Sequence, residues 1–229
     1  MIRLTIEDVE YVFDETLGVD LSRAVGSGVN AWYIGNPNIG PLEVGGAVYS
    51  VSSGAAVNFD QINFAPHAHG THTETFGHID ENQLLIEELT LPLFIPCKLI
   101  RPSLETIDGD QVLTEEALDL CDYKGVKALV IRLNPNKEYP GNYDHTNWPY
   151  LSESATKRLV EAGVEQLVPV GPSVDTEKDQ GAPLSHLPFL KGSATPKTSG
   201  SVAALSLIPG PFPAVHYLIT LQVTLYPSV

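Results

Sequence analysis

The stretch LSESATKRLVEAGVEQLVPV, residues 151–170, decides the fold class. Ser152 is placed to cap a helix, apolar residues recur along one face of that helix, and Gly163 is placed to end it. The apolar run at 164–170 then predicts a strand, and the run VKALVIRL at 126–133 predicts another strand before the helix. The order strand, loop, helix, strand is that of a βαβ unit, so the sequence predicts two parallel strands joined by a helix.

Segments on both sides of this unit extend the prediction to a larger sheet. Residues 46–64 indicate two strands about a Ser-Ser-Gly turn, and residues 113–121 indicate a short helix capped by Thr114. Residues 202–208 are apolar, and residues 215–226 alternate as one long, half-buried strand does. The whole chain of 229 residues is therefore predicted to form a single α/β domain with a mixed sheet.

The charge balance excludes several classes of protein. The chain has 13 Lys and Arg against 28 Asp and Glu, a formal net charge of −15, so we expect neither a nucleic-acid nor a membrane partner. The acidic start of the chain is unlike a signal peptide, and no apolar run is long enough for a membrane span. Only two cysteines are present, which favours a cytoplasmic location. An acidic surface is compatible with a bound cation and equally with simple solubility.

A histidine-rich stretch, PHAHGTHTETFGHID at residues 66–80, holds four of the seven histidines. In an extended segment, His72 and Glu74 point to the same face, and an imidazole with a carboxylate suits zinc, manganese or iron. The turn at Gly70 could fold either His67 or His69 back toward the same ion. A single histidine would more often make an ordinary polar contact, but this combination predicts a metal site.

The segment HGTHTETFGH resembles the signature of the metal-dependent cyclase/hydrolase family that includes bacterial kynurenine formamidase. That signature is His-x-Gly-Thr-His-x-Asp with a further histidine four residues on. Other matches, in similar order, are NAWYIGNP, VNFDQINFAPHAHGTHTE, PSVDTEKDQGAPLSH and YLITLQVTLYP. The resemblance covers roughly residues 18 to 226. It implies a swivelling β/β/α architecture and a homodimer or homotetramer.

The resemblance also implies roles for single residues. His72 matches a metal ligand, and Glu74 stands where the family has the aspartate that bridges two metals. His78 matches the general acid/base, and His186 matches a ligand of the second metal. Asp175 matches a position near the site, and we expect it to be structural or to support the ligands.

The chain departs from the family pattern at three points. The family's leading histidine falls on Ala68, so His67 is expected to replace it, with His69 as the alternative. Glu74 is one methylene longer than the aspartate of the family. Residues 187–229 contain no Asp or Glu, although two-metal members supply a Glu there. We therefore expect one divalent ion, zinc or manganese, and hold a second metal doubtful.

These residues predict a metal-dependent, arylformamidase-like hydrolase. An ion held by His67, His72 and Glu74 would activate water against a small amide, formamide, lactam or ester, with His78 moving the proton. The alternative is a catalytically degenerate relative that only binds a metal or small ligand. The connection at 134–150 carries aromatic residues that would either stack on substrate or pack on a neighbouring subunit: Tyr139, Tyr143, Trp148 and Tyr150.

Overall fold

The computed structural model describes residues 1–21, 29–74, 78–79, 81, 94–133, 141–178, 201–204, 216–219 and 224–227. For Glu15, Val19, Asp20, Glu74 and the strands after residue 200, it describes the backbone alone.

A mixed sheet of eight strands organises the molecule, in the order β3-β17-β16-β9-β12-β14-β15-β8. Its strands, in that order, are Val19–Asp20, Thr224–Pro227, His216–Ile219, Ile95–Ile100, Ala128–Ile131, Gln166–Pro169, Ser201–Ala204 and His72–Glu74. The four central strands β9, β12, β14 and β15 are parallel, and the flanking strands pair antiparallel. The chain is thus α/β with a mixed sheet, as predicted.

The predicted βαβ unit is confirmed. Strands β12 and β14 pair in parallel with Leu129 opposite Leu167, and helix α3 (Glu153–Glu161) lies between them in the chain. Ser152 caps α3 by accepting a hydrogen bond from the backbone N–H of Ala155 at 3.1 Å. Gly163 takes the left-handed conformation, with φ of 83°, directly after the helix, which is why the helix stops there.

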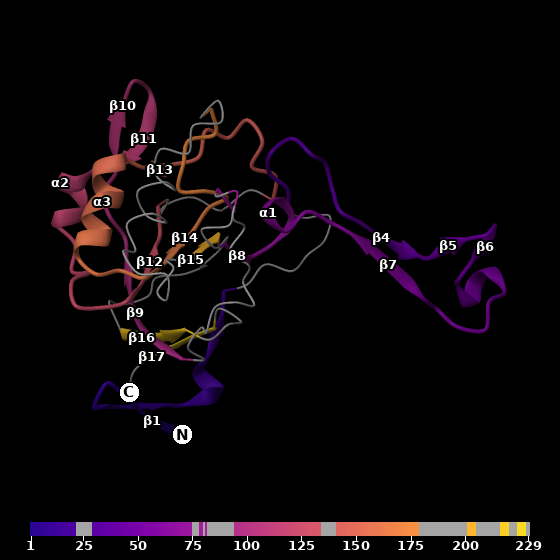
Figure 1. Cartoon of the computed structure of the whole chain (residues 1–229), viewed down its shortest axis with the longest axis horizontal. Coiled ribbons are helices and arrows are strands. Elements are labelled where there is room, and N and C mark those ends of the chain that lie inside the picture. The colour runs from indigo at the N-terminus through magenta and orange to yellow at the C-terminus, as the bar shows by residue number, and fades with distance from the viewer. Residues whose placement is uncertain are drawn as a thin grey trace.

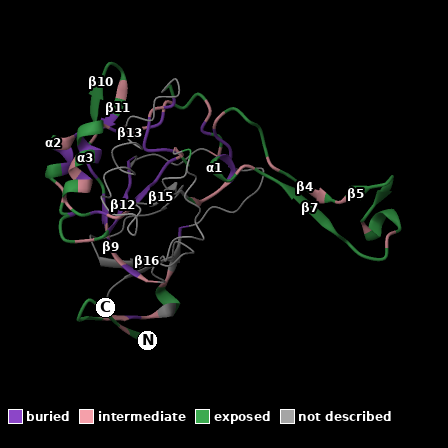
Figure 2. Cartoon of the chain, in the orientation of Figure 1, coloured by how far each residue is buried: buried purple, intermediate pink, exposed green. Residues whose placement is uncertain are grey.

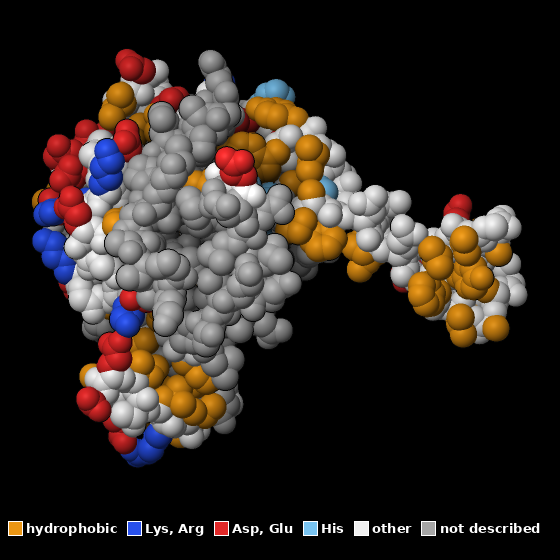
Figure 3. All heavy atoms as spheres, in the orientation of Figure 1, with side chains coloured by type: hydrophobic (Ala, Val, Ile, Leu, Met, Phe, Trp, Pro, Cys, Tyr) orange, Lys and Arg blue, Asp and Glu red, His pale blue; other side chains and the backbone are white. Residues whose placement is uncertain are grey.

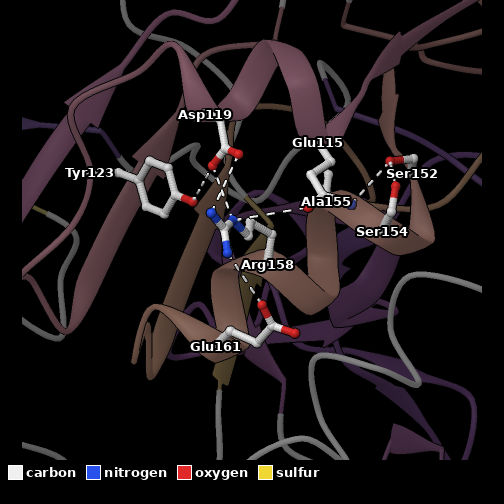
Figure 4. A network of polar contacts seen from close by, with 8 residues as sticks. All are labelled: Glu115, Asp119, Tyr123, Ser152, Ser154, Ala155, Arg158 and Glu161. Atoms are coloured by element: carbon white, nitrogen blue, oxygen red, sulfur yellow. Dashed lines mark hydrogen bonds and ion pairs between the residues drawn. The ribbon is translucent and has the colours of Figure 1, made fainter.

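Helix α2 (Glu115–Asp119) begins at the predicted cap, where the Thr114 hydroxyl accepts from the backbone N–H of Ala117. The two helices lie side by side on one face of the sheet (Figure 1). Arg158 of α3 joins them, because its guanidinium donates to the Asp119 carboxylate at 3.0 Å (Figure 4). That hydrogen bond holds the pKa of Asp119 below its ordinary value.

The core lies between these helices and the central strands, and Figure 2 shows buried residues concentrated there. All four residues of β12 are buried, as expected for a parallel strand covered on both faces. Leu159 of α3 and Leu167 of β14 are both 0% exposed and belong to one cluster with Leu113, Leu118 and Leu151. This packing fixes the carboxyl ends of the central strands.

Smaller elements surround the main sheet. They are the hairpin β1 (Ile2–Ile6) and β2 (Val9–Phe13), the 3-10 turn η1 (Glu15–Leu17), and the three-stranded sheet of β10 (Glu105–Ile107), β11 (Asp110–Leu113) and β13 (Tyr150–Leu151). None of the helices within the described ranges is long and apolar enough to cross a membrane.

A β-arm, residues 38–64, projects from the body (Figure 1). Its stem pairs β4 (Asn38–Pro41) with β7 (Asp60–Asn63), and its tip contains β5 (Glu43–Val44), β6 (Ala47–Val48) and the 3-10 turn η2 (Val51–Ser53).

The two strands predicted over 46–64 are present as β6 and β7, and η2 with Gly54 forms the predicted Ser-Ser-Gly turn between them. These strands do not pair with each other: β6 pairs with β5 across a tight turn at Gly45 and Gly46, with φ of 60° and 80°, and β7 pairs with β4. The predicted single strand over 215–226 is instead two strands, β16 and β17, which pair antiparallel with Leu218 opposite Tyr226.

Candidate functional site

A cavity lies at the carboxyl end of β14, the edge of a parallel sheet where ligands commonly bind. Gly171 and Pro172, which follow β14, form one wall. The cavity is small, with about 20 Å³ of space for water-sized groups, and is lined by Val29, Ala31, His67, Ala68, Gly70, His72, Tyr143, Gly171 and Pro172. Four segments far apart in the sequence therefore meet here, and one of them is the histidine-rich stretch.

Two histidine rings, those of His67 and His72, line this cavity, and a third, that of His78, lies against His67. The single-turn helix α1 (Pro66–His69) begins with proline, which suits the first position of a helix, and the chain then returns through an extended Gly70 into β8. The turn brings the rings of His67 and His72 to a centroid distance of 4.9 Å. The ring of His78 stacks on His67 at 4.5 Å.

His72 is oriented by its own turn. Its Nδ1 lies 3.0 Å from the Gly70 carbonyl oxygen, so the tautomer that satisfies this contact carries its proton on Nδ1. That tautomer presents the Nε2 lone pair, and a hydrogen bond from one ring nitrogen to a backbone carbonyl is the usual support of a metal-ligating histidine.

His69 is engaged differently. It is 4% exposed, its Nδ1 accepts from the backbone N–H of Ala65 at 3.0 Å, and its Nε2 lies 2.7 Å from the Gly35 carbonyl oxygen. Since Nδ1 is the acceptor, the proton sits on Nε2 and is donated to Gly35. Both ring nitrogens are thus used inside the chain, and His69 ties helix α1 to the turn before β4.

The turn at Trp32 and Tyr33 is held in an unfavourable backbone conformation. Both residues are left-handed, with φ of 64° and 60°, which is rare for bulky side chains. The Trp32 indole N–H donates to the backbone carbonyl of His67 at 3.2 Å, and its ring meets Trp148 edge-on at 5.1 Å. The Tyr33 N–H donates to the Asp144 carboxylate at 2.9 Å. These contacts fix the turn against the segment that carries His67.

Glu177 joins the same turn to the loop that contains Tyr143. Its carboxylate, on a residue 8% exposed, accepts hydrogen bonds from the Tyr33 hydroxyl and from the backbone N–H groups of His145 and Asn147, the last at 2.7 Å. Burial alone raises the pKa of Glu177, but these donors outweigh burial and hold it below the ordinary value. The hydrogen bond from the Tyr33 hydroxyl to Glu177 raises the pKa of Tyr33.

Sequence reasoning missed Glu177, because nothing in the pattern around it distinguishes it from a solvated acid. It also missed Gly171 and Pro172, although their place directly after a central strand was a usable signal.

The described aromatic residues of 134–150 lie in different surroundings. Tyr143 lines the cavity and is buried. Trp148 is 4% exposed and donates from its indole to the backbone carbonyl of Asp175, itself buried, at 2.8 Å, so it belongs to the interior of this chain. Tyr150 begins β13, and Tyr139 lies outside the described residues.

The family described as Putative cyclase matches residues 19–176 of the chain, well over half of its length. The chain belongs to this family. This match confirms the family membership that was predicted from the histidine-rich segment. Among curated proteins, none matches the chain in sequence.

Solved structures similar to this cyclase-family chain share its fold. One described as a potential metal-dependent hydrolase with cyclase activity is 14% identical, with a TM-score of 0.67 over 93% of this chain and 98% of the other. An isatin hydrolase bound to the product analogue thioisatinate is 16% identical, with a TM-score of 0.62 over 92% of each chain. A predicted metal-dependent hydrolase from Bacillus stearothermophilus is 15% identical, with a TM-score of 0.57 over 92% and 95%.

The predicted site residues divide into two groups. His67, His72 and His78 come together in the cyclase-family structure. Glu74 has its backbone in β8, but its side chain, like all of His186, lies outside what is described. Within the described residues, no group of three or more His, Cys, Asp or Glu side chains is arranged to hold a metal. The metal-ligand set therefore stays a prediction.

Proposed function

We propose that the protein is a metal-dependent hydrolase that cleaves a small amide, formamide, lactam or ester with an activated water molecule. The observation that carries the proposal is the convergence of the His67, His72 and His78 rings beside the cavity. Similar structures described as a metal-dependent hydrolase and an isatin hydrolase support the hydrolase class. We also propose the swivelling β/β/α architecture that the family resemblance implies.

The donor chemistry fits one divalent ion of the zinc or manganese type. His67 and His72 would supply imidazole nitrogens, and the tautomer of His72 presents Nε2. Glu74 would add a carboxylate, since in the extended backbone of β8 residues 72 and 74 share a face. His69 is the weaker alternative to His67, because both of its ring nitrogens are already hydrogen-bonded. A second ion, at His186, lacks the acidic ligand of the two-metal members.

When bound, such an ion polarises the substrate carbonyl and lowers the pKa of a water molecule. The chain's own groups perform the remaining tasks. His78, stacked on His67, takes the proton from water and returns it to the leaving amine or alcohol, as imidazole does near neutral pH. Val29, Ala31 and Pro172 give the cavity apolar walls that exclude bulk water.

The cavity favours a small substrate. In this structure the cavity has about 20 Å³ of space for water-sized groups, room for little more than one water molecule, and Tyr143 offers an aromatic ring to a flat substrate. An aryl formamide or an aromatic lactam has the required carbonyl group and a ring that Tyr143 could stack on, so we propose arylformamidase-like specificity. Cys97 and Cys121 are not joined in a disulfide, which supports a cytoplasmic setting.

The experiment is turnover of N-formylkynurenine, isatin and simple aryl esters by protein loaded with zinc or manganese, alongside its metal content. We expect about one ion per chain and hydrolysis of at least one substrate class. His78→Gln should lower kcat by roughly 10²–10⁴-fold without loss of metal. The matched control is His145→Gln, since His145 is exposed and does not line the cavity. Metal binding without any turnover would favour the degenerate relative, and absence of metal binding would contradict the proposal.

A further inference from the structure

The Glu177 carboxylate lies between two turns beside the candidate cavity. The first turn, residues 32–33, and the second turn, residues 145–147, each come shortly after a residue that lines the cavity. The carboxylate accepts from the Tyr33 hydroxyl in the first turn and from two backbone N–H groups in the second. We propose that Glu177 is a positioning residue, which holds Tyr143 where its ring can stack on an aromatic substrate. This role rests on the proposed function, and Glu177 itself does not line the cavity.

Backbone strain marks both turns. Among the described residues, seven non-glycine positions have a left-handed backbone, and three of them form the tight turns of the hairpins β1–β2 and β10–β11. The other four lie in the two turns that meet at Glu177: Trp32, Tyr33, His145 and Asn147. A left-handed backbone costs free energy at such residues, so surrounding contacts must hold it, and strain of this kind gathers at functional sites.

The turns are at the surface, whereas the group that joins them is buried. Tyr33 is 53% exposed, and His145, which contributes its backbone N–H rather than its imidazole, is exposed as well. Figure 3 shows hydrophobic and histidine side chains at this surface, near the root of the arm. Glu177 is 8% exposed and stays ionised, because its donors hold its pKa below the ordinary value. Hydrogen bonds to a charged group are roughly twice as strong as neutral ones, so one buried carboxylate can order two surface turns.

Glu177 acts on a different part of the second turn than its neighbour Asp144 does. Asp144 lies at the beginning of that turn and accepts from the backbone N–H of Tyr33 at 2.9 Å. Glu177 holds the end of the turn, where the Asn147 backbone N–H donates to it at 2.7 Å and the Asn147 side chain donates to Asp110. Loss of the Glu177 hydrogen bonds should therefore loosen the end of the turn first.

The end of the second turn leads directly to Trp148. Trp148, Tyr143 and Ala31 are buried in one cluster, against which Trp32 packs. A loosened turn therefore shifts Trp148 and the Tyr143 ring beside it. Because the cavity has only about 20 Å³ of space for water-sized groups, a small shift of the Tyr143 wall decides how a flat ring can lie against it.

The first test uses the two tryptophans of the chain, Trp32 and Trp148, whose rings meet edge-on at 5.1 Å. Tryptophan emission and acrylamide quenching of the full chain, without substrate, report whether the turns stay together. Glu177→Gln should shift the emission to longer wavelength and increase the quenching, because water reaches the loosened ring pair. Glu116→Gln, the same change at an exposed glutamate of α2, is the matched control and should leave both measurements unchanged.

The second test separates positioning from a general loss of structure. It compares aryl with alkyl substrates: phenyl acetate with methyl acetate, and formanilide with N-methylformamide. For Glu177→Gln, KM of the aryl substrate should rise about three- to tenfold, the contribution of one aromatic contact, while KM of its alkyl counterpart stays within about twofold. Tyr33→Phe keeps the ring and removes one of the three hydrogen bonds, so it should give a smaller aryl-selective rise even if Glu177→Gln folds poorly.

Two results would overturn this role of Glu177. One is tryptophan emission and quenching in Glu177→Gln that match the wild type, and the other is an equal rise in KM for the aryl and alkyl substrates. A wild type that hydrolyses none of the four compounds would contradict the proposed function, and the substrate role of Glu177 with it. The tryptophan measurement would then still decide whether Glu177 holds the two turns together.

Discussion

The βαβ core and the arm both contain strands, but they bury their apolar side chains to opposite extents. In the core, Leu129, Leu159 and Leu167 are 0% exposed, because helix α3 covers the parallel strands. In the arm, Ile62 lies in a strand whose four residues are all exposed, and its own side chain is 59% exposed. The difference teaches that an apolar pattern predicts that a face will be covered, but does not say whether the same chain covers it.

The largest difference in the free energy of unfolding should come from truncating one buried side chain in the core and one exposed side chain in the arm. Leu159→Ala removes a fully buried group and is expected to lower the free energy of unfolding by about 2–5 kcal/mol. Ile62→Ala should change it by less than about 0.5 kcal/mol in dilute solution. Urea unfolding of both variants measures the contrast. Equal losses would mean that the arm packs on its own body.

A second prediction concerns Glu177, which joins the turn at Tyr33 to the loop that contains Tyr143. Glu177→Gln keeps one accepting oxygen but turns an amide N–H group toward at least one of the two backbone N–H donors, and we expect a loss of about 1–3 kcal/mol above pH 6. Because the folded-state pKa of Glu177 is lowered, its carboxylate stabilises the fold above the unfolded-state pKa.

This contribution should disappear as pH falls through the folded-state value. The difference between wild type and Glu177→Gln is therefore expected to shrink steadily below about pH 4.5 in urea unfolding measured along a pH series. A difference that stays constant from pH 6 to pH 3 would contradict this role of the Glu177 carboxylate.

The sequence predicted the core well because each signal there is local. The caps Thr114 and Ser152, and the stop at Gly163, act within one helical turn and were found where expected. The two strands of 46–64 were also found, but the sequence did not reveal their partners, because β6 pairs across the tight turn at Gly45 and Gly46 and β7 pairs with β4, both upstream.

The site was predicted in part for the same reason. The sequence motif identified His67, His72 and His78 because they are close in the sequence, and the structure brings their rings together. Glu177, Tyr33 and the wall at Gly171 come from distant segments, and only the folded sheet brings them near the histidines. No local pattern marks a residue whose partners are more than a hundred positions away.

The smallest predicted difference in stability is between two serines that each stand directly before a helical segment. Ser152→Ala removes the cap of α3 and should cost about 1 kcal/mol. Ser50 precedes η2 in the arm but makes no capping hydrogen bond, so Ser50→Ala should change the free energy of unfolding by less than about 0.5 kcal/mol. Thermal unfolding of the two variants side by side checks the difference, and similar losses would show that the arm's turn matters as much as the core helix.

The central claim is that His67 and His72, beside the cavity, bind a metal, while His69 is a structural tie. The most direct measurement is the zinc and manganese content of wild type, His67→Gln and His69→Gln after loading and dialysis. The account predicts about one ion per chain in the wild type, near-complete loss in His67→Gln, and retention in His69→Gln, because glutamine can keep both hydrogen bonds of His69. A wild type that retains no ion, or loss in His69→Gln but not in His67→Gln, would contradict it.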